Sequence, residues 1–249
     1  MRRALKRFTR IVIKPNFMEC LRQYPKYFSD WIKYKKLEGA EPIKLKDCYP
    51  CLFDNTGHFS PANHYYYQDI WGLKHVYRSK VDVHVDIGSK AEYVGFLTAF
   101  TKVEFVDIRP LDVPYLKNFK NIKGSILQMP YEDSSVKSMS CLHVAEHIGL
   151  GRYGESLDYD GDLKAIGELK RVLGKDGNLL FVVPVGEPRI RFNAHRIYSY
   201  GQIIDYFSDY KLKEFSLIPD NGINGLVENA SPMSASAQKY GCGCFWFTR

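Results

Sequence analysis

Residues 81–110 read VDVHVDIGSKAEYVGFLTAFTKVEFVDIRP, and this stretch decides the fold. β-branched residues alternate up to Gly88, a pattern that predicts a strand running into a tight turn. Apolar residues at helical spacing then predict a helix over residues 91–100, and residues 103–106 predict a second strand that ends at Asp107. A glycine at the first turn and a carboxylate about 20 residues later are typical of a nucleotide-binding βαβ unit.

The turn at Gly88 leaves three interpretations open. A dinucleotide fingerprint needs three glycines, whereas the four residues from Gly88 read GSKA, so a pyrophosphate would be poorly held. S-adenosylmethionine (SAM) has a ribose and an amino acid but no phosphate to pack against the helix, so this turn suits it better. The third interpretation is an α/β core whose turn binds nothing. We expect SAM as the cofactor.

The composition is that of a folded chain that can bury one large core, or a core plus a small appendage. The 249 residues are 45% hydrophobic and 14% aromatic, which argues against disorder. No apolar run approaches the roughly 18 residues of a membrane span, and the basic start has neither the apolar core nor the cleavage site of a signal peptide. We expect a cytoplasmic address, with an N-terminal extension and linker over residues 1–62 and the main domain over residues 63–249.

Positive charge is concentrated near the start of the chain. Residues 1–36 hold eleven Lys or Arg and two acids, so their net charge is +9 and that of the remaining residues, given the total of +7, is −2. Leu5, Phe8 and Ile11 fall at helical spacing among the basic residues, which is typical of a helix on an anionic membrane surface. A solvated helix and a docking face for an acidic partner are equal alternatives. The slightly acidic remainder argues against nucleic acid as the partner.

Four of the six cysteines form two closely spaced pairs. Cys48 with Cys51 and Cys242 with Cys244 have chelate-like spacing and could together offer four thiolates to zinc. The second pair, however, lies in an aromatic run over residues 240–248 that reads as a terminal strand, where alternate residues face one side. We therefore favour reduced thiols in the core and expect no metal.

Strands and helices alternate along the rest of the chain. Further strands are expected over residues 121–126, 136–142, 178–183, 211–218 and 240–248, which with the first two makes seven. Helices are expected from residue 64 with Asn63 as N-cap, over residues 162–173 closed by Gly174, and over residues 198–207. In the extension, one helix should end at Pro15 and a second, over residues 17–37, should be interrupted near Pro25.

The final two strands follow each other with no predicted helix between them. This order predicts an α/β, Rossmann-like fold with a seven-stranded, mostly parallel sheet and an antiparallel C-terminal hairpin strand.

Several motifs over roughly residues 64–249 resemble the class I SAM-dependent methyltransferases. They are VDIGS at 85–89, VD at 106–107, AEHI at 145–148 and ELKRVLGKDGNL at 168–179. A closer resemblance is to the domain-of-unknown-function 268 family, a bacterial methyltransferase-like group often associated with surface-polysaccharide genes. It is carried by HYYYQD at 64–69, SCLHVAEHIGLGRYG at 140–154 and FNAHR at 192–196.

The resemblance implies a SAM site at the strand ends. Its residues would be Asp86, Gly88, Ser89, Asp107, Ile108, Ser125, Ile126, Leu127 and His143. The first three would line the methionine end, Asp107 would hold the ribose, and residues 125–127 would flank the adenine. The chain has Gly124-Ser125 where many class I enzymes have an acid that bonds the adenine amino group.

The segment from His143 to His147 has three interpretations. It matches the HxxEH zinc motif in letters, it could be a structural pair of histidines, or it could serve the substrate as an acid, a base or a positioning group. We favour the last, because ligands of open sheets lie at strand C-termini. Methyl transfer to a hydroxyl needs alignment and a base. The candidates are His147 and His195 as bases, with Glu146 and Asp69 as orienting acids, although each could be purely structural.

Arginines surround the same predicted face. They suggest an anionic acceptor such as a phosphorylated or nucleotide-linked sugar, the alternative being solvated loop charges. The candidate substrate-binding residues are Arg152, Tyr153, Arg189, Arg191 and Arg196. We predict a SAM-dependent methyltransferase that O-methylates a sugar, glycan or phosphorylated intermediate of bacterial surface-polysaccharide synthesis. The alternative is a non-catalytic SAM-binding or SAM-lapsed scaffold that docks to a membrane-bound glycan assembly through its basic leader.

Overall fold

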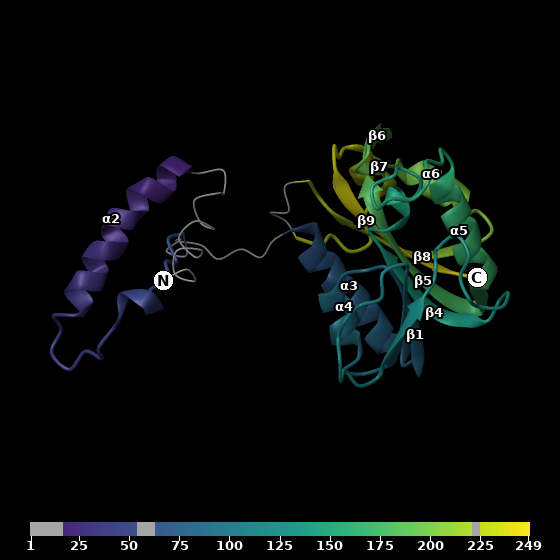
Figure 1. Ribbon diagram of the computed structural model, residues 1–249. Helices are drawn as coiled ribbons and strands as arrows, with labels where there is room; N and C mark the ends of the chain where they lie inside the picture. Colours follow the sequence, from purple (N-terminus) through teal and green to yellow (C-terminus); the bar gives the residue numbers. More distant parts are fainter. Residues whose placement is uncertain (1–16, 54–62, 221–224) are drawn as a thin grey trace. The chain divides into compact units, whose positions relative to one another are not determined.

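The computed structural model describes residues 17–53, 63–220 and 225–249, and the chain divides into two compact units, Met1–Ser60 and Pro61–Arg249. The helix expected before Pro15 lies outside the described residues. In the first unit, α2 (Phe17–Tyr34) runs through Pro25 without a break, so the predicted interruption is wrong (Figure 1). A proline removes only one backbone donor, and the amphipathic pattern continues on both sides of it. The 3₁₀ helix η1 (Leu45–Asp47) follows.

None of the described helices is both long enough and apolar enough to cross a membrane.

The second unit is built on one seven-stranded sheet with the order β3-β2-β1-β4-β5-β9-β8. The strands are β1 (Val83–Ile87), β2 (Lys102–Asp107), β3 (Phe119–Lys123), β4 (Val136–Leu142), β5 (Leu173–Val185), β8 (Lys211–Ile218) and β9 (Gly241–Thr248). Strands β1 to β5 pair in parallel, and β9 pairs antiparallel with both β5 and β8. The predicted fold class is confirmed.

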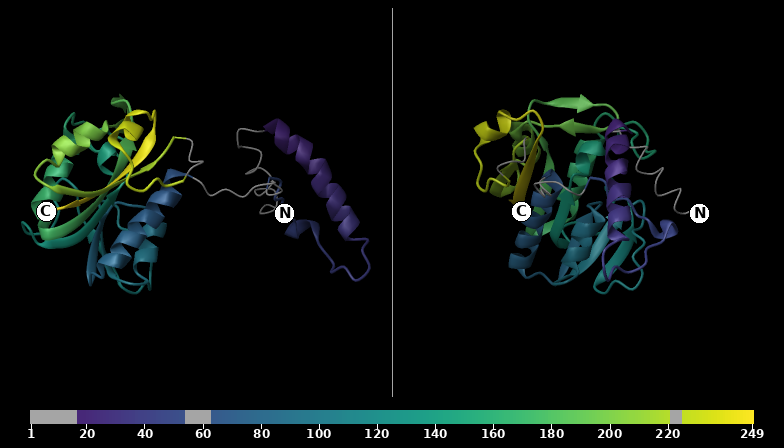
Figure 2. Two further views of the ribbon diagram at one scale, coloured as in Figure 1. Left: turned by 180° about the vertical axis from the view of Figure 1, so that it is seen from behind. Right: turned by 90° about the vertical axis from the view of Figure 1, so that its left-hand side faces the viewer.

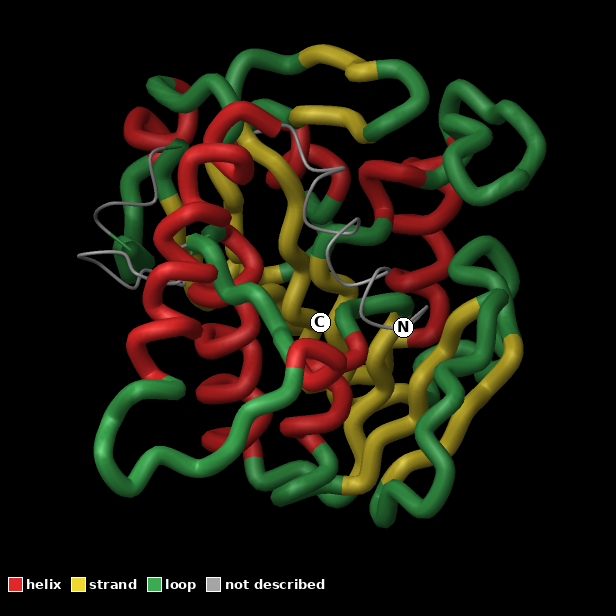
Figure 3. The backbone as a smooth tube through the Cα atoms, turned by 60° about the vertical axis from the view of Figure 1, so that its left-hand side comes forward, coloured by secondary structure: helices red, strands yellow, loops and turns green. Residues whose placement is uncertain are grey.

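Helices cover both faces of this sheet (Figures 1 and 3). They are α3 (His64–Ser79), α4 (Ala91–Leu97), α5 (Gly161–Val172), α6 (Tyr200–Tyr206) and the short α7 (Pro232–Ser236). Trp71 and Tyr93 bury one face of the sheet beneath α3 and α4, whereas Leu169 and Phe207 bury the other beneath α5 and α6. Burying each such side chain stabilises the fold by roughly 2 kcal/mol.

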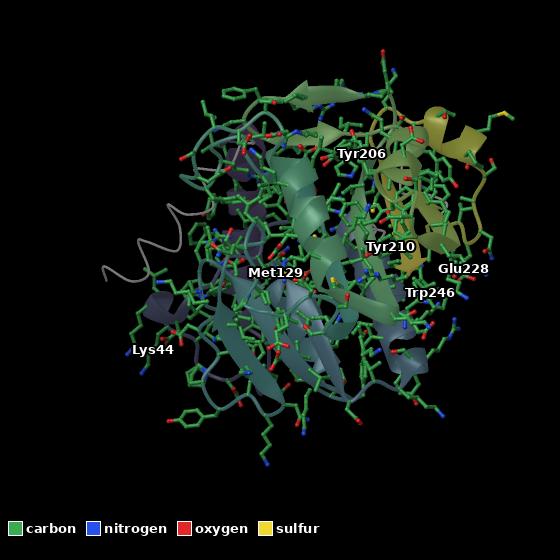
Figure 4. All side chains as sticks on the ribbon, turned by 90° about the vertical axis from the view of Figure 1, so that its right-hand side faces the viewer. Lys44, Met129, Tyr206, Tyr210, Glu228 and Trp246 are labelled. Atoms are coloured by element: carbon green, nitrogen blue, oxygen red, sulfur yellow. The ribbon has the colours of Figure 1, made fainter. Side chains whose placement is uncertain are left out.

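Local hydrogen bonds fix where these helices begin and what they touch. The Asn63 side chain accepts from the Tyr66 N–H at 2.9 Å, so the predicted N-cap is confirmed. The Tyr210 hydroxyl donates to the Lys170 carbonyl at 2.9 Å, which ties the segment after α6 to α5 (Figure 4). The Trp246 indole donates to Asn178 at 2.8 Å and joins β9 to β5 (Figure 4).

The structure differs from the sequence prediction at several connections. Helix α5 passes directly into β5 at Leu173, so Gly174 lies in the strand and does not close the helix. Strand β5 continues beyond Pro184, whose carbonyl accepts from the Tyr198 N–H at 3.0 Å. Helix α7 lies between β8 and β9, where no helix was predicted.

Two further differences affect the edge and the end of the sheet. Strand β3 lies two residues earlier than the predicted start at Asn121. The hairpin of β6 (Arg189–Arg191) and β7 (His195–Ile197) was not predicted; it follows β5 and lies at one end of the sheet (Figure 2).

The cysteines of β9 behave as core residues. Cys242 and Cys244 are both buried beneath α3 and α4, as the terminal-strand interpretation predicted. Within residues 17–53, 63–220 and 225–249, no group of three or more His, Cys, Asp or Glu is placed to hold a metal ion.

Candidate functional site

A pocket of about 140 Å³ lies at the carboxyl ends of β1, β2, β3 and β4. Its lining comes from the last residues of β1 and β2 and from the segments that follow the four strands: Ile87, Gly88, Val106, Asp107, Ile108, Arg109, Gly124, Ser125, Ile126, Leu127, His143, Val144, His147, Ile148, Tyr153 and Glu155. The chain runs outward from β1 to β3 on one side and from β4 to β5 on the other. The pocket therefore lies at the topological switch point, where open parallel sheets bind ligands.

Gly88 forms the floor of the pocket. Its φ of +61° is in the left-handed region, and its N–H donates to the Val106 carbonyl at 3.0 Å. A Cβ at this position would lie 3.3 Å from Val144 and 3.5 Å from Oδ2 of Asp107. Both the backbone conformation and the space require glycine, and the missing side chain leaves room for a ligand beside the carboxylate.

Asp107 ends β2 and lies in the pocket wall with its side chain 13% exposed. Its Oδ1 accepts from the Arg109 backbone N–H at 2.6 Å, which fixes the carboxylate. Its Oδ2 faces Gly88. A carboxylate held in this way can accept hydrogen bonds from the hydroxyls of a ribose.

Asp86 and Ser89, both predicted cofactor contacts, are buried and do not belong to the pocket lining. Asp86 accepts from the Ser89 N–H at 3.0 Å and from the Ser140 hydroxyl. The Ser89 hydroxyl accepts from the Leu142 N–H at 3.3 Å. Burial raises the pKa of Asp86 to about 7. The structure thus gives these two residues the task of bracing the turn at Gly88 from behind.

The wall expected at the adenine is apolar. Ile108 and Leu127 are 48% and 43% exposed and line the pocket. Ile126 also lines it, and the Ser125 hydroxyl accepts from the Leu127 N–H at 3.1 Å. This bond shapes the turn, and the apolar side chains can contact the faces of a planar ring.

His147 lies on a single 3₁₀ turn, η2 (Ala145–His147), so the segment does not form the α-helical face that a zinc motif requires. Its Nδ1 is 2.6 Å from the Ala194 carbonyl oxygen and 3.1 Å from the Arg152 guanidinium; because the carbonyl contact is the shorter one and a carbonyl can only accept, Nδ1 carries the hydrogen and donates it. Nε2 is then the acceptor. Burial lowers the pKa of His147 to about 4, which keeps the ring neutral near pH 7.

His143 and Glu146 are buried on either side of this turn. His143 lines the pocket with φ of +57°, its Nδ1 has no hydrogen-bond partner among the described residues, and burial lowers its pKa to about 3. Both carboxylate oxygens of Glu146 also lack a partner there, and Oε1 is 3.6 Å from Nε2 of His147. Burial raises the pKa of Glu146 to about 8.

The remaining predicted catalytic residues lie at different places. His195, on β7, is adjacent to His147, with 6.3 Å between ring centroids. Asp69 lies on α3 outside the pocket lining, and its carboxylate accepts from the Gln68 amide at 3.2 Å. Burial raises the pKa of Asp69 to about 6. The structure therefore groups His147, Glu146 and His195 and leaves Asp69 apart from the pocket.

The predicted substrate-binding residues also separate. Tyr153 lines the pocket, and Arg152 donates to the same Ala194 carbonyl as His147, at 3.0 Å. The Arg191 guanidinium lies 5.2 Å from the Tyr240 ring centroid. Arg189 donates to the carbonyls of Glu187 and Lys239 at 2.7 and 2.6 Å.

Arg196 is buried beneath the loop between η2 and α5. It donates to the Ile148 carbonyl at 2.6 Å and to the carbonyls of Asp158 and Tyr159 at 3.3 and 3.2 Å. Its Nε is 3.3 Å from Asp162. These contacts give Arg196 a structural role, in place of the substrate contact expected from the sequence.

Arg109 and Glu155 line the pocket but were not singled out from the sequence. The Arg109 guanidinium lies 4.6 Å from the Tyr153 ring centroid and so connects the end of β2 to the loop after η2. Arg109 could have been found from the sequence, because it lies only two residues after Asp107. No sequence pattern around Glu155 predicts that it lines the pocket, because only the path of the loop brings it there.

Several solved structures with a similar fold are methyltransferases. The Burkholderia thailandensis 1,6-didemethyltoxoflavin-N1-methyltransferase with S-adenosylhomocysteine (SAH) has a TM-score of 0.54, 10% identity, and a match covering 76% of this chain and 80% of that one. The N-methyltransferase NodS of Bradyrhizobium japonicum with SAH has a TM-score of 0.52 and 14% identity, and the match covers 75% of this chain and 88% of NodS. A geranyl diphosphate methyltransferase with SAM has a TM-score of 0.53 and 12% identity, and the match covers 73% of this chain and 84% of that one. At these identities the likeness establishes the fold.

Relatives by sequence are less informative about activity. An uncharacterized protein of Methanocaldococcus jannaschii is 27% identical over 115 residues, which cover 43% of this chain and 44% of that protein. The chain thus matches less than half the length of this curated relative.

The family described as Caenorhabditis protein of unknown function, DUF268, matches residues 91–215. This is the family expected from the sequence motifs, although its description is not the bacterial one that we expected. The matched segment is just over half of the 249 residues, and the chain therefore belongs to the DUF268 family.

Proposed function

We propose that the protein is a SAM-dependent methyltransferase. The observation that carries the proposal is the pocket at the switch point of the sheet, where Gly88 leaves space directly beside Oδ2 of Asp107. Two of the similar folds hold SAH and one holds SAM, which supports the same ligand here.

The lining residues fit this cofactor. The Asp107 carboxylate would accept from the ribose hydroxyls, and Ile108 and Leu127 would contact the adenine faces. Gly88, whose added Cβ would fill the space beside Val144, would let the ligand approach the backbone. When bound, SAM supplies a methyl group on a positively charged sulfur.

His147 is the base that we propose for an oxygen acceptor. Its Nδ1–H is held by the Ala194 carbonyl, so Nε2 is the atom that accepts the proton from the acceptor hydroxyl. Because its pKa is lowered to about 4, the ring is in the basic form at neutral pH. The oxygen that has lost this proton would take the methyl group from the sulfur, which would be left neutral in SAH. The acceptor that we propose is a sugar, glycan or phosphorylated intermediate of surface-polysaccharide synthesis, supported by the cationic side chains of Arg152 and Arg191 near this turn.

Calorimetric titration of the full chain with SAM and with SAH tests the cofactor. We expect both to bind, and we expect Asp107→Ala to lower their affinity at least about tenfold, the effect of one or two lost hydrogen bonds to a charged group. Asp112→Ala, at an exposed position outside the pocket lining, is the matched control. Absence of binding by either ligand would contradict the proposal, and binding without turnover on any acceptor would favour the scaffold.

A further inference from the structure

Four buried polar atoms near His147 lack hydrogen-bond partners among the described residues. They are Nδ1 of His143, both carboxylate oxygens of Glu146 and Nε2 of His195. Folded proteins rarely leave buried polar groups unpaired, because desolvation is then uncompensated. Such a concentration at one place indicates that something outside the chain supplies the missing partners.

These atoms lie in or directly beside a group of aromatic and imidazole rings, which we call the ring cluster: His64, Tyr65, His143, His147, His195 and Tyr240. Its neighbouring centroids are close: Tyr65 to His143 is 5.3 Å, His195 to Tyr240 is 5.1 Å and His64 to Tyr240 is 5.6 Å. The rings come from the start of α3, the segment after β4, the hairpin strand β7 and the residue before β9. Since His143 and His147 also line the pocket, the ring cluster and the pocket share a wall.

Cations surround the exposed side of the ring cluster. Lys90 Nζ lies 4.0 Å from the Tyr65 centroid, and the Arg191 guanidinium lies 5.2 Å from the Tyr240 centroid. Both cations are exposed. Glu146 is the nearby acid: burial and then its charge raise the pKa of Tyr65. Exposed cations outside and a buried carboxyl inside favour a ligand with an anionic group at the rim and neutral hydrogen-bonding groups within.

The unpaired atoms narrow the ligand further. A neutral imidazole can donate or accept, so hydroxyls, which do both, match the unpaired ring nitrogens of His143 and His195. The tyrosine faces suit the C–H groups of a saturated ring. A cationic amine would meet Lys90 and Arg191 at the entrance. A metal ion is a poor match, because the described residues contain no group of three ligands placed for one.

We propose that the ring cluster is the acceptor site, and that it takes a sugar ring carrying an anionic group. This inference rests on the proposed methyltransferase function. His195 would bond a ring hydroxyl, Arg191 and Lys90 would hold the anion, and the hydroxyl to be methylated would face Nε2 of His147. Glu146 is fully buried with its Oε1 3.6 Å from that nitrogen, and it is a positioning residue that acts through His147.

Three probes that share a ring and differ in charge test the inference: glucose phosphate, methyl glucoside and glucosamine. Each is titrated into the full chain saturated with SAH, and binding is followed by calorimetry. We expect glucose phosphate to bind at least about tenfold more tightly than either of the others, because it adds charge-assisted bonds. Equal or tighter binding of the neutral or the cationic ring, or binding of none of the three, would overturn the inference.

Variants separate the acceptor site from the cofactor site. We expect Arg191→Ala and His195→Asn to weaken glucose phosphate about tenfold while SAH affinity stays within twofold of the wild type. Arg78→Ala, an exposed arginine in the last turn of α3, is the control and should change neither. Unchanged glucose phosphate affinity in both variants would refute the assignment. Loss of SAH binding by the wild type would instead refute the proposed function itself.

Glu146→Gln tests the positioning role with a readout that a merely structural residue would not move. We expect SAH affinity to be retained and the alkaline side of the pH profile of turnover on glucose phosphate, near pH 8, to change, because Glu146 ionises there beside His147 and glutamine does not. An unshifted profile would remove Glu146 from this role.

Discussion

Gly88 is the residue at which the pocket tolerates least change. At φ of +61° an added Cβ is strained, and at 3.3 Å from Val144 it also needs its neighbour to move. We expect Gly88→Ala to lose about 1–3 kcal/mol of unfolding free energy and most of the SAM affinity, measured by urea unfolding and calorimetry. Gly95→Ala is the control: Gly95 lies in α4 with nothing within 4 Å of an added Cβ. That variant should gain about 0.5–1 kcal/mol.

Glu146 gives the fold a pH dependence whose sign follows from its raised pKa of about 8. The folded state keeps a proton that the unfolded chain releases above its ordinary value near 4.5. The stability that this group contributes is therefore complete below that value and is lost as the pH rises towards 8. The lowered pKa values of His143 and His147 act in the opposite direction, since their contribution is lost as the pH falls below 6.5.

Glu146→Gln removes the loss of stability that Glu146 causes as the pH rises towards 8, and it leaves the contributions of the two histidines in place. We expect the difference in unfolding free energy, wild type minus variant, to fall by about 3 kcal/mol between about pH 5 and about pH 8. Urea titrations of both proteins at the two pH values measure it. A difference that stays constant with pH would show that Glu146 is ionised in the folded protein across this range.

Residue spacing predicted Asp107 and Gly88 at the pocket because each follows a strand by a fixed number of residues. The resemblance to class I methyltransferases placed Asp86 and Ser89 with the ligand, whereas both are buried beneath the turn. A period of two tells which face of a strand a side chain occupies but not whether another segment covers it. The fold brings His64 and Tyr65 next to Tyr240, which is far from them in the sequence, so no sequence pattern could predict that they lie together.

The loop between η2 and α5 is the element that shapes one side of the pocket. Tyr153 and Glu155 line the pocket from this loop, and Arg196 holds it by bonds to three of its carbonyls. A Cβ on Gly149 would lie 2.1 Å from the Asp158 carbonyl oxygen, so the two ends of the loop are in contact. Arg196 thus controls the loop without touching the pocket.

Replacing Arg196 should loosen this loop. We expect Arg196→Met to lower the unfolding free energy by about 2–4 kcal/mol, because buried carbonyls and Asp162 lose their partner. Hydrogen exchange should accelerate over residues 148–161, and SAM affinity should fall several-fold. Arg189→Met, on β6, should leave exchange in this loop unchanged. Unaltered exchange in Arg196→Met would show that the loop is held by other contacts.

Elements with strong periodicity were predicted well, and those that depend on remote partners were not. The bounds of β4 and β8 match the prediction. Strands β6 and β7 have three residues each, too few for a period, and they exist because they pair with each other. The junction of α5 and β5 was missed because Leu173 pairs with Val136, a contact that no local pattern announces.

At the scale of the whole chain, charge and apolar surface are unevenly divided. Residues 1–36 carry a net charge of +9 while the rest carries −2. In α2, Leu21 and Ile32 are 51% and 49% exposed and lie three helical turns apart, hence on one face. Arg22, Lys26 and Lys33 occupy a neighbouring face. This combination is typical of helices that lie on anionic lipid.

We therefore expect the full chain to bind vesicles containing phosphatidylserine and to be released by salt. Reversing three charges by Arg22→Glu, Lys33→Glu and Lys36→Glu should weaken binding about a hundredfold or more, since each basic residue near such a surface contributes about 1 kcal/mol. Lys117→Glu, Lys211→Glu and Lys213→Glu change the net charge equally at exposed positions of the second unit. Co-sedimentation should show that this control retains binding. Equal losses in both variants would mean that net charge alone decides the interaction, and no binding by the wild type would favour an acidic protein as the partner of residues 1–36.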